Sequence, residues 1–150
     1  IVMMVNFILG VTLPTDEEFI AADLNGDGEL NVVDVVSNIS NILDVRNDNF
    51  SYDPFESIRI NQKDKFINIP KNSDIAGIEI HFKNKCNILS SKIDNNWTIR
   101  NYNNKVVLYT NDLKSMSKNF SIKFDTYSKI DRIIVSDKSS SLIKSRIYKK

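Results

Sequence analysis

The spacing of apolar residues changes once along the chain. Through residues 1–44, apolar side chains recur at steps of three and four, most clearly at Val32, Val35, Val36 and Ile39. This spacing places them on one face of a helix. Farther along the chain the step falls to two, which is the spacing of a strand with one buried face. The sequence therefore predicts a helical part followed by a β-rich part.

Two helix boundaries in the first part are marked by capping residues. Gly10 follows an apolar run over residues 1–9, at the position where a left-handed residue ends a helix. Thr15 lies three residues before Glu18, which is the spacing of a capping box at the start of a helix. The expected order is helix, short helix, polar loop and helix.

The β-rich part divides into about nine strands. Seven segments are rich in Ile, Val, Phe and Tyr and are separated by polar residues: 56–61, 65–70, 75–82, 105–110, 120–125, 131–137 and 142–148. Two weaker candidates lie at 87–89 and 97–100. This number of short strands is typical of an antiparallel β-sandwich.

The predicted fold class is α+β, with a small helical domain over residues 1–44 and a β-sandwich over 55–150. Residues 45–54 separate the two compositions, are mostly polar and end in a proline. Such a segment is typical of a loop between periodic segments. We therefore interpret it as a linker between two domains.

Charge is divided unequally between the two parts. The first fifty residues hold nine acids against one basic residue, Arg46, and the last hundred hold nineteen Lys or Arg against ten acids. Complementary charge favours a modest, salt-sensitive contact between the parts, and two independent domains on a linker are the alternative. The apolar side chains of Met3, Met4 and Phe7 would need covering by one or other surface.

The stretch DLNGDGELNVVD, residues 23–34, carries oxygen-bearing side chains at alternate positions. Calcium takes six to eight oxygen ligands at roughly 2.3–2.6 Å, and a twelve-residue loop can supply them from positions one, three, five, seven, nine and twelve. Gly28, at position six, permits the sharp turn such a loop needs. Glu29 would give its carbonyl, and Asn31 would bind directly or through water. The predicted Ca2+ ligands are Asp23, Asn25, Asp27, Glu29, Asn31 and Asp34.

The sequence DLNGDGELNVVDVV resembles the calcium-binding repeat of type I dockerin domains, in which Asp rather than Glu stands at position twelve, as Asp34 does. The run IVMMVNFILG aligns with VVSNISNILD as the exit helix of a first repeat, which would place the first loop upstream of Ile1. The resemblance covers residues 1–44 and implies a cohesin-like protein partner, in cis or in trans. It departs from the family at Val32 and Val33, where dockerins often carry hydroxyl residues that recognise cohesin.

The strand-rich part is weakly similar to cohesin-like and carbohydrate-binding sandwiches, through IAGIEIHF, IIVSD and the number of strands. Two functions therefore remain open. One is a non-catalytic, calcium-stabilised interaction module of a larger secreted or surface protein. The other is a carbohydrate-binding accessory of an upstream polysaccharide-degrading enzyme, with Trp97 and Tyr102 stacking on sugar rings or, alternatively, Trp97 anchoring the core. Calcium dependence favours an extracellular or cell-surface location, where the ion is abundant.

The composition argues against catalysis. The chain has one histidine, one cysteine and neither a nucleophile elbow nor a glycine-rich phosphate loop, so we do not expect an enzyme. His81 is expected at solvent or an interface, and Cys86 is expected to be buried and inert. Basic residues alternate with acids along the strands, so nucleic acid is not an expected partner. The apolar run at Ile1 is too short to span a membrane.

Overall fold

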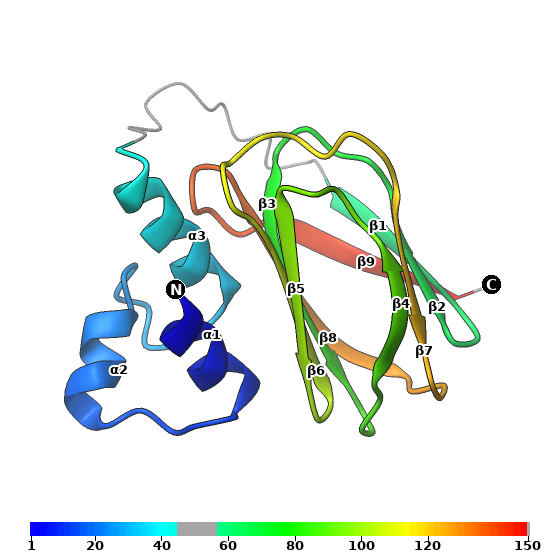
Figure 1. The fold of residues 1–150 in the computed structure, drawn as a ribbon, viewed down its shortest axis with the longest axis horizontal. Helices are drawn as coiled ribbons and strands as arrows, with labels where there is room; N and C mark the ends of the chain where they lie inside the picture. The colour runs from blue at the N-terminus through cyan, green and yellow to red at the C-terminus, as the bar shows by residue number, and fades with distance from the viewer. Residues whose placement is uncertain (45–56, 150) are drawn as a thin grey trace.

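The structure is a computed structural model that describes residues 1–44 and 57–149. Three helices precede nine strands within these residues, in the order expected from the spacing of apolar residues. The helices stand together beside one face of a two-layered β-sandwich (Figure 1). Their bounds are Val2–Leu9 for α1, Asp16–Ala22 for α2 and Val32–Ile42 for α3. None of the described helices is long and apolar enough to cross a membrane.

The nine strands form two sheets, with the order β4-β7-β2-β1-β9 in one and β5-β6-β3-β8 in the other. The two weaker candidates of the sequence are strands β4 and β5. The bounds are β1 Ser57–Lys63, β2 Phe66–Ile69, β3 Ile75–Phe82, β4 Ile88–Lys92, β5 Trp97–Tyr102, β6 Lys105–Thr110, β7 Phe120–Phe124, β8 Ile130–Asp137 and β9 Lys144–Lys149.

One pairing differs from the expected antiparallel sandwich. Strands β1 and β9 run parallel, from the pair Ser57 and Lys144 to the pair Gln62 and Lys149. These strands lie at opposite ends of the β-rich segment and are not joined by a hairpin. A short turn therefore does not force them to run antiparallel.

The inner faces of the two sheets enclose a hydrophobic core. Every second residue of β2 and β7 points into it: Ile67 and Ile69 from β2, and Phe120, Ile122 and Phe124 from β7. Strand β3 is different, because all of its residues except one are buried. Both faces of β3 are therefore covered, the inner face by the opposite sheet and the outer face by the helices.

The helices bury a second hydrophobic cluster against the outer face of the β5-β6-β3-β8 sheet. Helices α1 and α3 contribute their apolar faces, and the sandwich contributes side chains from four segments. The sandwich residues are Ala76, Val107, Tyr109, Leu113 and Ile134. The helical part therefore packs on the sandwich in this structure, and the centre of the interface between them is apolar.

Charged groups lie at the edge of this interface. Arg132 of β8 pairs with Glu29, with 2.6 Å between Nη2 and Oε2. The Lys105 ammonium donates a hydrogen bond of 2.8 Å to the Ile8 carbonyl near the end of α1. Met4 is buried in the cluster and Met3 remains 60% exposed. The predicted linker, residues 45–54, lies outside the described residues.

Candidate metal centre

The predicted calcium loop lies between α2 and α3. Helix α2 begins at a capping box, in which the Thr15 hydroxyl accepts from the Glu18 N–H at 3.2 Å and the Glu18 carboxylate accepts from the Thr15 N–H at 2.9 Å. The helix ends at Ala22, and Asp23 is its C-cap. The loop therefore starts where the sequence analysis placed it.

Side-chain oxygens at alternate loop positions accept hydrogen bonds from the loop backbone. The Asp23 carboxylate accepts from Gly26 and Gly28, each at 2.9 Å. The Asn25 side-chain oxygen accepts from the Asp27 N–H at 3.0 Å, and the Asp27 carboxylate accepts from the next alternate residue, Glu29, at 2.8 Å. The side chains at positions one, three and five therefore hold the turns of the loop through its backbone N–H groups.

Gly28 has the backbone conformation that the sequence analysis required of it. Its φ is +79°, in the left-handed region that residues with a Cβ seldom adopt. No heavy atom lies within 4 Å of the position a Cβ would take. Glycine is therefore required at this position by the backbone turn and not by crowding.

Asp34 joins the loop to α3. Its Oδ1 accepts from the Leu24 N–H at 2.9 Å, and its Oδ2 accepts from the Asn31 N–H at 3.0 Å. The residue is fully buried. Burial raises the pKa of this carboxyl, and the backbone hydrogen bonds offset part of that rise. A carboxylate held here would gain from a neutralising charge.

Asn31 has a structural role in addition to its predicted one. Its side-chain oxygen accepts from the Val33 N–H at 2.9 Å and caps the N-terminus of α3, in a capping box completed by Asp34. The side chain is buried, and its contribution to a metal, directly or through water, stays a prediction. Two of the six predicted ligands, Asn31 and Asp34, therefore also form the N-terminal cap of α3.

The donor set fits calcium in chemistry and register. All of the predicted ligands bear oxygen, and five of them supply side-chain oxygens from one short loop, as a hard cation requires. In the part of the chain that the structure describes, no group of three or more His, Cys, Asp or Glu side chains is placed to hold a metal ion. The loop carboxylates are bonded to backbone N–H groups instead, and calcium binding stays a prediction.

A buried carboxylate on β3 contacts the beginning of α3, which sequence reasoning missed. Glu79 is 2% exposed, and its Oε2 accepts from the Val32 N–H at 3.0 Å. Its Oε1 lies 2.5 Å from Nε2 of His81. A helix N-terminus favours a carboxylate because its first N–H groups lack partners within the helix. The one available signal for Glu79 was an acid among apolar residues in IAGIEIHF. The His81 side chain is 20% exposed.

Trp97 is a core residue and not a sugar-stacking platform. It is 4% exposed and packs edge-to-face against Phe120, with ring centroids 5.1 Å apart. Tyr102, at the other end of β5, is 42% exposed. The proposed aromatic row containing both residues is therefore wrong. A single Trp in a small sandwich contributes more by filling the core than by binding at the surface.

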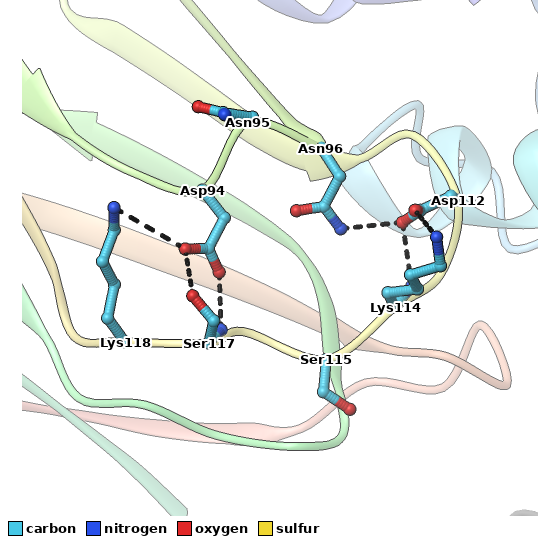
Figure 2. Close-up of a pocket in the computed structure, with 8 residues that line it drawn as sticks. All are labelled: Asp94, Asn95, Asn96, Asp112, Lys114, Ser115, Ser117 and Lys118. Atoms are coloured by element: carbon cyan, nitrogen blue, oxygen red, sulfur yellow. Dashed lines mark hydrogen bonds and ion pairs between the residues drawn. The ribbon is translucent and has the colours of Figure 1, made fainter.

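A polar cleft lies between the turn after β4 and the loop before β7 (Figure 2). Asp94 accepts from the Ser117 N–H and hydroxyl at 2.5 and 2.6 Å, and Asp112 accepts from the Asn96 amide at 2.8 Å. Burial raises the pKa of each carboxyl, but these hydrogen bonds outweigh it and leave both pKa values lowered. The hydrogen bonds of Asp94 and Asp112 therefore tie the turn after β4 to the loop before β7.

Comparison with known proteins gives distant structural similarities only. No protein-family model matches the sequence, and no curated protein matches it. The chain is similar to a non-cellulosomal cohesin from the archaeon Archaeoglobus fulgidus, at 12% identity and a TM-score of 0.40, covering 61% of this chain and 84% of that one. It is also similar to a chain of a type I cohesin–dockerin complex from Clostridium thermocellum, at 11% identity and a TM-score of 0.40, covering 66% and 92%.

Proposed function

We propose that the chain is a non-catalytic, calcium-binding interaction module of a secreted or cell-surface protein, with a protein as its partner. The observation that carries the proposal is the position of Asp34, which hydrogen-bonds both to the start of the loop and to the cap of α3. Together with the resemblance of residues 23–34 to a dockerin repeat, this position supports a loop built around a cation.

Calcium, when bound, would supply positive charge to the three carboxylates of Asp23, Asp27 and Asp34. Residues of the chain itself order the loop and the start of α3. Gly28 reverses the backbone, Asn31 caps α3, and Glu79 receives the first N–H of that helix. A loop that is ordered in this way keeps the apolar face of α3 directed at the sheet. The role proposed for the metal is structural, because calcium ligated by protein oxygens serves order rather than chemistry at an open position.

The packing of α1 and α3 on the sandwich supports a contact in cis between the dockerin-like part and the β-rich part. The carbohydrate-binding alternative loses its main candidate, since Trp97 is in the core. No other described feature favours it over a protein partner.

Calorimetric titration of the whole chain with calcium, after treatment with a chelator, tests the proposal. We expect binding in the wild type and at least about tenfold weaker binding in Asp27→Asn, which removes one charged ligand from an exposed position. Asp34→Asn should weaken binding further. Asp44→Asn is the matched control, because Asp44 lies outside the loop and its φ of +51° suits Asn.

Absence of binding at millimolar calcium would overturn the proposal. Binding by Asp27→Asn and Asp34→Asn that equals the wild type would overturn the assignment of these residues. Circular dichroism of each variant without calcium shows whether its fold survives, so a loss of binding can be separated from a loss of structure.

A further inference from the structure

The surface that remains for a partner lies on the helices. The outer face of the β5-β6-β3-β8 sheet is covered by α1 and α3. Exposed apolar side chains of the sandwich, such as Phe66 and Leu142, lie on separate segments. On the helical part, by contrast, several exposed or half-exposed apolar side chains border a single groove. The described residues that line it include Ile1, Met3, Phe7, Glu18, Ala21 and Asn38.

The groove is formed by all three helices. Met3 and Phe7 come from α1, Ala21 from α2 and Asn38 from α3. Its volume is about 250 Å³, which is below the roughly 300–1,000 Å³ of most small-molecule sites. It is therefore suited to receive one or two side chains of a partner rather than a whole ligand. Met3 is 60% exposed at its edge, and a methionine adapts readily to an incoming apolar surface.

The charge around the groove selects the chemistry of that partner. Glu18 lines the groove, and Asp16 and Glu17 lie in the same first turn of α2. Residues 1–44 contain eight acids and no Lys, Arg or His. All charged side chains of this segment are acidic, so the groove attracts cationic groups at its edge and repels anionic ones.

We propose that this groove docks a basic amphipathic helix from a partner protein. Its apolar face would rest on Met3, Phe7 and Ala21, and flanking Lys or Arg side chains would face Glu18 and its acidic neighbours. A helix laid in a groove is a common mode of peptide recognition, with affinity from apolar anchors and orientation from charge. The inference rests on the proposed function as an interaction module and assigns the surface and the partner chemistry to it.

Other occupants fit the surface less well. An anionic membrane would be repelled by the acids of α2, since cationic segments are what such surfaces attract. A second copy meeting groove to groove would bring like charges together, which opposes a symmetric contact. These two occupants are outcomes that the experiment separates from the proposal.

The test is fluorescence anisotropy of the whole chain, saturated with calcium, and a synthetic helix of about 16 residues with Leu on one face and Lys beside it. A second peptide with Glu in place of every Lys keeps the apolar face and reverses the charge. We expect the Lys peptide to bind at least about tenfold more tightly than the Glu peptide. The difference should shrink as salt is raised, because screening weakens exposed charges.

Paired variants locate the binding surface. Met3→Asn alters the groove and should weaken binding of the Lys peptide by about tenfold. Ile20→Asn is the matched control, because Ile20 is 74% exposed on α2 and does not line the groove. The affinity of this variant for the Lys peptide should equal that of the wild type. Glu18→Gln keeps the capping pattern but removes the charge, and it should reduce both affinity and salt dependence.

Several results would overturn the inference. These are no binding of the Lys peptide, equal weakening by Met3→Asn and Ile20→Asn, or equal binding of both peptides. Self-association of the chain that Met3→Asn abolishes would make a second copy the occupant. Sedimentation with anionic phosphatidylserine vesicles would make a membrane the occupant. Calcium binding is measured separately by calorimetry, so failure of the groove leaves the proposed function intact, and failure of calcium binding is recognised independently.

Discussion

Gly77 of β3 lies directly against Val32 of α3: a Cβ built on Gly77 would be 2.7 Å from Cγ2 of Val32. Cγ2 of Val36, one helical turn farther along, would be 2.9 Å away. Real Cβ contacts are essentially never that short, so the absence of a side chain at residue 77 sets how closely α3 approaches the sheet. The close approach also brings the Val32 N–H within hydrogen-bonding distance of Glu79.

The first prediction is that Gly77→Ala destabilises the fold. Overpacking at this contact is expected to lower the free energy of unfolding by about 1–3 kcal/mol, as measured by urea denaturation. Val32→Ala removes the nearer of the two methyl groups that a Cβ at residue 77 would meet. The double variant should lose less stability than the sum of the losses in the two single variants, because the residues are in contact. Strict additivity would show that the helix does not sit on Gly77.

The second prediction concerns what holds the helical part on the sandwich. Ile39→Ala removes a side chain that is 2% exposed in the shared cluster, and it should cost about 2–5 kcal/mol. Arg132→Gln breaks the ion pair with Glu29. Both side chains of this pair are about half exposed. The substitution should cost no more than about 1 kcal/mol.

Salt distinguishes the two contributions. The effect of Arg132→Gln should shrink at high salt because the pair is exposed and screened, and the effect of Ile39→Ala should not. Denaturation curves of both variants in low and high sodium chloride provide the measurement. If Arg132→Gln lowered the free energy of unfolding more than Ile39→Ala, the contact between the two parts would be mainly electrostatic, as net charge suggests.

The third prediction is a pH dependence of stability from Asp94. Burial raises the pKa of this carboxyl, but hydrogen bonds from the Ser117 hydroxyl and N–H outweigh it, so the folded-state pKa lies below the usual 3.8. A lowered folded-state pKa contributes stability that is fully present above the unfolded-state value and is lost as pH falls through the folded-state value. The loss therefore occurs below about pH 3.8.

Asp94→Asn should destabilise the wild-type fold at pH 7, by about 1–3 kcal/mol for lost hydrogen bonds to a charged group. The difference between variant and wild type should narrow below the usual carboxyl pKa, as the wild type becomes protonated. Lys118→Gln is the control: its ammonium lies 3.8 Å from Asp94 and is about half exposed, so it should change stability little at either pH.

The fourth prediction is that Cys86 is unreactive in the folded protein. The side chain is 1% exposed, and burial, with the charge of Asp125, raises the pKa of its thiol to about 11. Because the thiolate is the nucleophile, alkylation by iodoacetamide at pH 8 should be at least about a hundredfold slower than in urea. Equal rates followed by mass spectrometry would show that the segment opens readily.

Several parts of this architecture follow from the local pattern of the chain. The change from a period of three and four to a period of two separates the three helices from the nine strands in the described residues. Capping chemistry at Thr15 and Gly10 marks helix ends because each residue satisfies or closes the backbone next to it. The left-handed conformation of Gly28 follows in the same way, because a loop with oxygen-bearing residues at alternate positions needs a sharp turn at position six.

The tertiary structure decided what local spacing cannot encode. The burial of Trp97, the parallel pairing of β1 with β9 and the docking of α3 on β3 each join residues far apart in the sequence. Net charge suggested that the two parts would meet but not how, because exposed charges act over about a Debye length and do not choose a face. The apolar residues of α1 and α3 determine which face of the sandwich the helices cover. These side chains are removed from water only against an apolar sheet face, and Gly77 allows α3 to approach that face closely.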